Sequence, residues 1–306
     1  FNQMEGPPIK SDLQVTYSPP TLDISQFTPS EEGKRSIAEV TIRAKPLGVG
    51  KGDIIDKKQS QFKFCGASVK DNSVYFKDSK EKPRNFSYPK QIFNDEHDNQ
   101  AIFNELMGQH LVNFLDGYNL NILAYGQTGS GKTYTMIGPR GAFDYPASED
   151  SIPSVWGMFP RFLHALYLQI KDDKMKALSI SVKQDSMFFP EDLITRKQIR
   201  FVPDMNEYIG HKEVILESFE DIVRICKIIE KVRASRSTKM NTESSRIHCF
   251  MNLKLYQCNA NKMVQCSQCR FVDLCGSERN EVMSEKDEGA RMESVLNNFN
   301  LLLLLQ

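Results

Sequence analysis

Residues 122–135, Ile-Leu-Ala-Tyr-Gly-Gln-Thr-Gly-Ser-Gly-Lys-Thr-Tyr-Thr, decide the fold of this chain. An apolar strand leads directly into Gly126-x4-Gly131-Lys132-Thr133, which matches the phosphate-binding pattern G-x-x-x-x-G-K-[ST] at every fixed position. Glycines let the backbone curl so that successive N–H groups point at phosphate oxygens, and the following helix adds the positive end of its dipole. The alternative, a glycine-rich surface turn, would need neither the preceding strand nor Thr133. We therefore expect a nucleoside triphosphate site, in which Lys132 reaches the β- and γ-phosphates and the Thr133 hydroxyl holds Mg²⁺.

Composition argues against several classes of protein. The chain has 306 residues with 39 basic and 39 acidic side chains, so no net charge draws it to nucleic acid or to a membrane surface. Hydrophobic residues make up 40%, which is ordinary for a globular protein with a full core. No run approaches the roughly 20 apolar residues of a membrane span, and the first residues do not resemble a secretory signal. The first residue is Phe1 rather than Met, which is typical of a fragment.

The cysteines favour a reducing compartment, because there are 7, an odd number. Cys266 and Cys269 form a C-x2-C pair with Cys258 nearby, but a zinc site needs four ligands, and no histidine or second cysteine pair lies in register. We interpret the segment 263–274 as an apolar strand in which the cysteines act as small hydrophobic residues.

The chain reads as an irregular N-terminal extension over residues 1–36, rich in proline, serine and charge, followed by one domain over residues 37–306. Apolar periodicity predicts strands at 38–44, 178–182, 247–256 and 263–274, small antiparallel strands between 51 and 82, and helices at 98–114, 157–170 and 218–232. Ser218 and Asp221 predict a capping box. Strands that alternate with helices, with the phosphate loop after a strand, predict an α/β fold: a mostly parallel central sheet with helices on both faces.

Two further polar segments carry chemistry. The buried strand Phe271-Val-Asp-Leu-Cys-Gly276 ends in Asp273, whose carboxylate can hold a Mg²⁺-bound water. The backbone N–H of Gly276 can close on a γ-phosphate and release it after hydrolysis. The loop Asn241-Thr-Glu-Ser-Ser-Arg-Ile-His248 offers hydroxyl groups for Mg²⁺ and the γ-phosphate. Taken alone, either segment is also compatible with an ordinary turn.

Together these segments resemble the kinesin motor domain over about residues 38–300. Four strings carry the resemblance: Tyr125-Gly-Gln-Thr-Gly-Ser-Gly-Lys-Thr-Tyr-Thr-Met136 as the phosphate loop, Asn241-x-x-Ser-Ser-Arg-x-His248 as switch I, Asp273-Leu-Cys-Gly-Ser-Glu-Arg279 as switch II, and Arg43-Ala-Lys-Pro46 at the end of the first strand. The resemblance implies a P-loop NTPase fold of kinesin type, ATP or ADP with Mg²⁺ as the cofactors, and microtubules as the partner.

The resemblance also implies residue roles. The nucleotide-binding residues would be Arg43, Lys45, Pro46, Gly126, Gln127, Thr128, Gly129, Ser130, Gly131, Lys132, Thr133 and Tyr134. The catalytic residues would be Lys132, Asn241, Ser244, Ser245, Arg246, Gly276 and Glu278. Mg²⁺ would be held by Thr133, Ser245 and, through water, Asp273. Adenine would lie among Arg43, Lys45, Pro46 and Tyr134, Asn241 and Ser244 would position the attacking water, and an Arg246–Glu278 ion pair would close the two switches.

In kinesins the segment after switch II faces the microtubule. Arg279, Lys286 and Arg291 are therefore candidate contacts with the acidic surface of tubulin. Five acidic residues crowd the same stretch and oppose such binding: Glu281, Glu285, Asp287, Glu288 and Glu293. A solvated helix entry without a partner remains an alternative interpretation of this stretch.

The chain departs from the family pattern at several positions. Ile247 replaces the usual Ser of switch I, which removes a hydroxyl near the water network and is expected to slow hydrolysis. Cys275 replaces the usual Ala of switch II, and the segment 178–194 keeps only Asp192-Leu-Ile194 of the family string. The sequence ends before the family's neck, so we expect a motor domain that is incomplete at its C-terminus, with any coiled-coil self-association beyond it.

The sequence leaves three functions to be distinguished. The first is a microtubule-stimulated ATPase motor, and the second is a non-motile microtubule protein that binds nucleotide but cycles slowly or not at all. The third, another P-loop ATPase or GTPase, is disfavoured because a GTPase would carry a guanine-reading Asn/Thr-Lys-x-Asp string, which the sequence lacks. We expect a cytoplasmic, cytoskeletal location on microtubules, with cilium and spindle equally open, no nucleic-acid partner and no membrane insertion.

Overall fold

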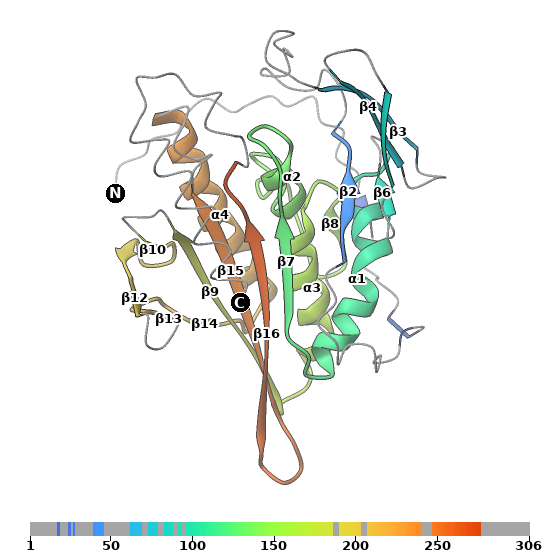
Figure 1. Cartoon of the computed structure of the whole chain (residues 1–306). Coiled ribbons are helices and arrows are strands. Elements are labelled where there is room, and N and C mark those ends of the chain that lie inside the picture. The colour runs from blue at the N-terminus through green and yellow to red at the C-terminus, as the bar shows by residue number, and fades with distance from the viewer. Residues whose placement is uncertain are drawn as a thin grey trace.

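A computed structural model gives the arrangement of the elements (Figure 1). The structure describes residues 17–18, 24–25, 27, 39–45, 62–68, 73–78, 83–87, 91–93, 96–185, 190–202, 207–239 and 247–276. Among these residues, no helix is long and apolar enough to span a membrane.

A central sheet organises the molecule, with the strand order β11-β10-β9-β15-β16-β7 and β14 paired to β9. Its long strands are β9 (Lys176–Asp185), β15 (His248–Cys258) and β16 (Val264–Asp273), and β7 (Leu120–Ala124) lies at the edge. The short strands are β10 (Glu191–Asp192), β11 (Lys197–Gln198) and β14 (Val214–Ile215).

The prediction of a mostly parallel sheet was wrong, because the sheet is mixed. Of its pairings only β16–β7 is parallel, whereas β9–β15, β15–β16, β9–β10, β10–β11 and β9–β14 are antiparallel. β15 and β16 are joined by the short turn 259–263, and a connection of that length allows only an antiparallel pair. In Figure 1 this hairpin extends beyond the rest of the sheet. The parallel pairing matters for function, because its register places Asp273 opposite Ala124, just before the phosphate loop.

Three helices cover one face of the sheet (Figure 1). They are α1 (Asn99–Leu115), α3 (Met158–Ile170) and α4 (Phe219–Lys239), and α3 packs against both of the others. Alternate residues of β15 and β16 face them and are fully buried, among them Met251, Leu253 and Phe271. The ring of Phe271 lies 5.5 Å from Phe159 and 5.3 Å from Phe162 of α3, measured between centroids. The expected helices of the opposite face are not among the described elements.

The helix ends follow local sequence. The predicted capping box is confirmed at the start of α4, where the Ser218 hydroxyl accepts from the Asp221 N–H at 3.2 Å and the Asp221 carboxylate accepts from the Ser218 N–H at 3.1 Å. Asp98 caps α1 by accepting from the Ala101 N–H at 2.7 Å. The helix α4 runs to Lys239, about two turns past the predicted end at Val232.

The described residues form four smaller sheets besides the central one. β3 (Phe62–Ser68), β4 (Ser73–Asp78) and β5 (Pro83–Ser87) are antiparallel, which confirms the small antiparallel strands expected there. β2 (Thr41–Arg43) pairs in parallel with β6 (Gln91–Phe93), and β12 (Arg200–Val202) pairs with β13 (Glu207–Ile209). Within the expected N-terminal extension, β1 (Tyr17–Ser18) pairs with β8 (Ile152–Pro153).

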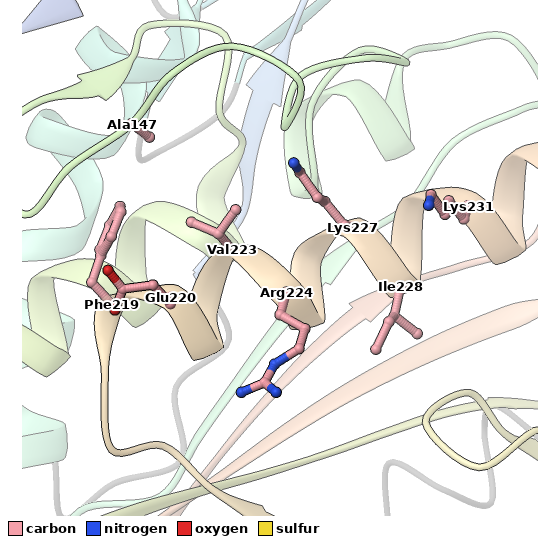
Figure 2. Close-up of a pocket in the computed structure, with 8 residues that line it drawn as sticks. All are labelled: Ala147, Phe219, Glu220, Val223, Arg224, Lys227, Ile228 and Lys231. Atoms are coloured by element: carbon pink, nitrogen blue, oxygen red, sulfur yellow. The ribbon is translucent and has the colours of Figure 1, made fainter. Parts of the chain in front are cut away.

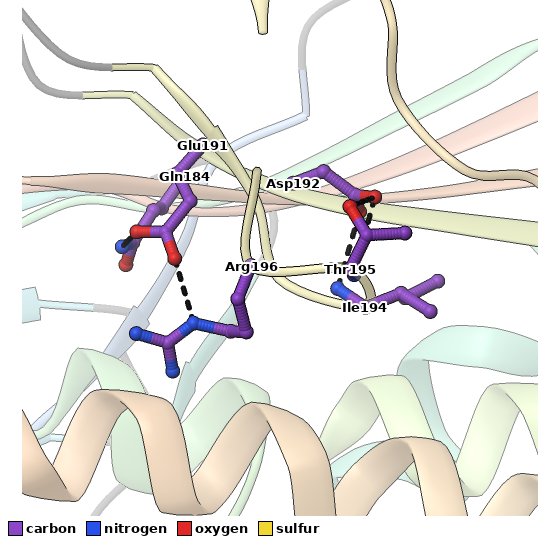
Figure 3. Close-up of polar contacts among 6 residues, drawn as sticks. All are labelled: Gln184, Glu191, Asp192, Ile194, Thr195 and Arg196. Carbon is purple, nitrogen blue, oxygen red and sulfur yellow. Dashed lines mark hydrogen bonds and ion pairs between the residues drawn. The ribbon is translucent and has the colours of Figure 1, made fainter. Parts of the chain in front are cut away.

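The turn after β10 explains why one short string of the segment 178–194 keeps the family pattern (Figure 3). The Asp192 carboxylate, fully buried, accepts from the N–H groups of Ile194 and Thr195 at 3.1 and 3.3 Å and from the Thr195 hydroxyl at 2.6 Å. Arg196 takes a φ of 60° and donates to Glu191 at 2.6 Å. Asp192 therefore stabilises a tight turn, a structural role that sequence comparison alone does not separate from a functional one.

Candidate nucleotide site

The phosphate loop connects β7 to the short helix α2 (Lys132–Met136). Gly126, Gly129 and Gly131 have φ values of 154°, 80° and 98°, a region that side chains other than glycine rarely enter. A Cβ added at Gly129 or Gly131 would meet no atom of the described residues within 4 Å, so there is open space beside both glycines. The loop therefore has the curled backbone and the free space that a phosphate group requires.

Lys132 lies across this loop. Its Nζ donates to the carbonyl oxygens of Gly126 at 2.7 Å and Gln127 at 2.9 Å. Gln127 and Thr128 are exposed on the rim, and Ser130 is half-buried and donates its N–H to the Gln127 carbonyl at 3.2 Å. An ammonium group held by loop carbonyls can exchange them for phosphate oxygens, because both are oxygen acceptors at the same loop.

Thr133 and Asp273 meet at the end of the parallel pair β7–β16. The Thr133 hydroxyl donates to the Asp273 Oδ2 at 2.5 Å, although the two residues are 140 positions apart in the chain. Asp273 is fully buried. The structure thus brings together the two residues that the sequence assigned to the metal side of the site.

Arg233 of α4 completes this contact, and the sequence analysis missed it. Its Nη2 forms an ion pair with the Asp273 Oδ2 at 2.6 Å and donates to the Thr133 hydroxyl at 3.3 Å. Burial lowers the pKa of the guanidinium, but the Asp273 carboxylate and Cys249 together outweigh it, and the pKa is raised. One signal was available, because Arg233 continues the buried stripe of Ile222, Cys226 and Ile229 at helical spacing.

The donor set fits a magnesium ion with a nucleotide phosphate. Asp273 Oδ1 is buried and has no hydrogen-bond partner in the part of the chain that the structure describes. A buried carboxylate oxygen without a partner is costly unless a cation or a bound water satisfies it. Hydroxyl and carboxylate oxygens, here from Thr133 and Asp273, are the ligands that Mg²⁺ prefers. These two residues would hold the ion, directly or through water.

Arg43 and Tyr134 lie together on the other side of the loop. The Arg43 guanidinium carbon is 5.2 Å from the centroid of the Tyr134 ring, and its Nη1 donates to the Asn99 Oδ1 at 2.5 Å and the Thr135 hydroxyl at 2.8 Å. Lys45 instead reaches the loop itself, where its Nζ donates to the Gly129 carbonyl at 3.0 Å. Two of the residues expected around adenine therefore form one stacked unit, and Lys45 joins the phosphate side.

The kinesin motor domain family matches residues 43–306. This chain belongs to the kinesin family. The kinesin-like protein KIN-12B of Oryza sativa subsp. japonica is 34% identical over 210 residues, which cover 61% of this chain and 18% of that protein. The kinesin-like protein KIN-12A of Arabidopsis thaliana is 28% identical over 293 residues, covering 89% of this chain and 21% of that protein. The kinesin chain thus spans about a fifth of the length of these relatives.

Solved kinesin structures share the fold. One is a fast kinesin, with a TM-score of 0.66 at 24% identity, covering 84% of this chain and 71% of the other. Another is the C-terminal motor domain of Kar3 from Candida glabrata, with a TM-score of 0.57 at 26% identity, covering 79% of this chain and 75% of the other. These comparisons confirm the prediction of a P-loop NTPase fold of kinesin type, with the sheet corrected to mixed.

Several predicted site residues of this kinesin lie outside the described residues, and their roles stay predictions. They are Pro46, expected at the adenine, Asn241, Ser244, Ser245 and Arg246 of switch I, Glu278 of switch II, and the candidate microtubule contacts Arg279, Lys286 and Arg291. Gly276 is described and is buried directly after β16.

The two positions where this kinesin departs from the family strings are both buried. Ile247 is 7% exposed and immediately precedes β15. Cys275 donates its N–H to the His248 Nδ1 at 3.2 Å, and its Sγ lies 3.7 Å from the His248 Nε2. The residue that replaces Ala in switch II thus packs against the last residue of the switch I string, so the two strings are in contact at this point. Of the C-x2-C pair, Cys269 is buried as expected, but Cys266 is exposed and does not act as a core residue.

A groove of about 490 Å³ lies elsewhere, along α4 (Figure 2). Figure 2 shows Lys227 and Val223 on the side of Ala147, whereas Arg224 and Ile228 point to the other side of the helix. No phosphate-loop residue lines it; its lining is Ala147, Phe219, Glu220, Val223, Arg224, Lys227, Ile228 and Lys231. The charged and polar side chains that could bind a nucleotide lie instead around the phosphate loop and Lys132.

Proposed function

We propose that this chain is the motor domain of a microtubule-binding ATPase that hydrolyses ATP with Mg²⁺ and couples closure of switches I and II to microtubule affinity. We further propose that residues 37–306 form this domain and residues 1–36 an N-terminal extension. The single observation that carries the proposal is the junction of Thr133, Asp273 and Arg233 beside an open phosphate loop. It joins α2, β16 and α4, so a change in the phosphate site reaches three elements at once.

Bound Mg-ATP supplies the phosphoryl group to be transferred and a cation that offsets its charge. The chain's part is positioning. Lys132 exchanges the loop carbonyls for phosphate oxygens, and the open glycines of the loop admit those oxygens close to the backbone. Arg233 holds the Asp273 carboxylate in place, so that Asp273 and Thr133 present their oxygens on one side of the loop.

The switch residues supply the remaining steps of this proposal. Ser244 and Asn241 orient the attacking water, Ser245 joins Thr133 at the metal, and Arg246 pairs with Glu278 to close the site. Gly276 provides the N–H that senses the γ-phosphate. Arg279, Lys286 and Arg291 then meet the acidic tubulin surface, and the protein acts on the microtubule cytoskeleton, in a cilium or a spindle alike.

The runner-up is a non-motile kinesin-like protein that decorates microtubules and cycles slowly or not at all. Buried Ile247 favours it, because no hydroxyl is available at that position for the water network. Steady-state ATP hydrolysis with and without microtubules, beside a Lys132→Ala variant, separates the two. Strong stimulation that disappears in Lys132→Ala supports the motor, whereas co-sedimentation with microtubules without stimulated turnover supports the decorator.

A further inference from the structure

Asn99, the first residue of α1, connects three separate segments beside the phosphate loop. It is 1% exposed. Its Oδ1 accepts from the Arg43 Nη1 at 2.5 Å, and its Nδ2 donates to the carbonyl oxygens of Tyr134 and Val155, each at 3.1 Å. One carboxamide therefore ties β2, the phosphate-loop helix α2 and the segment after β8 to the start of α1.

The chemistry of the partners fixes the orientation of this amide. A guanidinium has only donors, so it must face the Asn99 oxygen, and two carbonyl oxygens are acceptors, so they must face the nitrogen. The opposite orientation would place two donors together and three acceptors together. Asn99 therefore meets its partners in one way only, which makes it a rigid support.

The group that Asn99 supports is the stacking pair, defined here as Arg43 and Tyr134. Burial lowers the pKa of the Arg43 guanidinium, against the opposing effect of Tyr134 and Asp98. The guanidinium is thus largely out of water, and its plane is held by Asn99, by the Thr135 hydroxyl and by the Tyr134 ring. The Tyr134 ring itself is 37% exposed, so part of it is free to receive another flat group.

We infer that Asn99 is a positioning residue for the nucleobase: it holds the stacking pair in the position in which a purine ring can stack on it. This inference rests on the proposed function, because it assumes that a nucleotide occupies the phosphate loop. The hydrogen bonds of the Asn99 side chain go to Arg43, Tyr134 and Val155 and not to Lys132 or Asp273, so we expect its effect to fall mainly on the base side.

Two consequences distinguish this role from general support of the fold. Loss of Asn99 weakens binding of a nucleotide but spares binding of the phosphate moiety alone. Because stacking reads the flat face of a base and not its hydrogen-bonding edge, adenine and guanine nucleotides lose affinity by the same factor. A merely structural residue would lower the affinity for every phosphate ligand together.

The test is equilibrium binding of ADP, GDP and inorganic pyrophosphate, each with magnesium, to the wild type and to variants of Asn99. In Asn99→Ala we expect about a tenfold loss for ADP and GDP, the effect of one charge-assisted hydrogen bond, and no change for pyrophosphate. Asn99→Asp keeps an acceptor for Arg43 but sets an oxygen against the Tyr134 and Val155 carbonyls, so we expect it to lose less ADP affinity than Asn99→Ala. The matched control is Asn113→Ala, which removes another buried asparagine of α1, remote from the loop.

Several results would overturn the inference. An equal loss of affinity for ADP and for pyrophosphate in Asn99→Ala would show that Asn99 only supports the fold. An unchanged affinity for ADP would show that Asn99 has no role in binding the base. If Asn99→Ala does not fold, Thr135→Val removes one acceptor of Arg43 without touching α1, and it must show a smaller selective loss for ADP. A wild type that binds none of the three ligands would instead refute the proposed function, and the inference with it.

Discussion

Replacing Arg233 by alanine tests the junction that the sequence did not reveal. Arg233→Ala removes the ion pair to the buried Asp273 and leaves Thr133 as the remaining donor to that carboxylate. Breaking a buried ion pair by removing one partner costs about 3–5 kcal/mol. Because the Arg233 side chain is 14% exposed and Thr133 still donates, we expect the lower end, about 3 kcal/mol of unfolding free energy. For a domain of this size that corresponds to a fall in Tm of roughly 6–12 °C.

The assay is thermal unfolding of the wild type, Arg233→Ala and the matched control Arg224→Ala, each with and without Mg-ADP. Arg224 lies on the same helix and pairs with Asp221, but its side chain is 69% exposed, and a surface pair contributes less than about 1 kcal/mol. Mg-ADP is expected to raise the Tm of Arg233→Ala more than that of the wild type, because a cation beside Asp273 replaces the lost guanidinium. Equal Tm values for the two arginine variants would refute the reasoning.

Three further predictions concern other parts of the chain. Burial lowers the pKa of His164 from 6.5 to about 4, so the unfolded chain binds a proton there more readily than the folded protein. The free energy of unfolding therefore falls by up to about 1.4 kcal/mol per pH unit as the pH drops from 6.5 to 4. His164→Gln should flatten this slope in urea titrations relative to the wild type, and an unchanged slope would contradict the prediction. Gly129→Ala is expected to weaken pyrophosphate binding, because its φ of 80° strains any other residue and would distort the loop backbone that faces the phosphate. Gly141→Ala, at a φ of 84° outside the phosphate loop, should spare binding and lose only about 1–2 kcal/mol of stability. Ile247→Ser is expected to speed ATP turnover, but burying the new hydroxyl should lower the free energy of unfolding by about 1–3 kcal/mol. Slower turnover in a folded variant would contradict the interpretation that Ile247 slows hydrolysis.

The sequence predicted the structural features that depend on neighbouring residues. The strand, glycine loop and helix around Lys132, the capping box at Ser218 and the hairpin strands β15 and β16 all follow from neighbouring residues. The meeting of Thr133 and Asp273 was also predictable, because the family strings name both residues and the parallel pairing of β7 with β16 brings the strand ends together.

Features that depend on distant pairing were not predictable in the same way. The direction of β9 relative to β15 is set by tertiary contacts, and the alternation of strands with helices suggested a parallel sheet that the structure does not have. Arg233 and Asn99 gain their importance only from partners between 35 and 100 positions away, and neither stands in a recognisable string. The strands from β10 to β14 are two or three residues long, too short to show a period.

The most direct test of the central claim is a crystal structure of the protein with magnesium and a non-hydrolysable ATP analogue. The account predicts phosphate oxygens against the open side of Gly129 and Gly131, with the Lys132 Nζ moved from the loop carbonyls onto them. It also predicts a magnesium ion coordinated by the Thr133 hydroxyl on the side of Asp273, and the purine on Tyr134. A nucleotide bound elsewhere, for example in the groove along α4, or a phosphate loop left unchanged by saturating ligand, would contradict it.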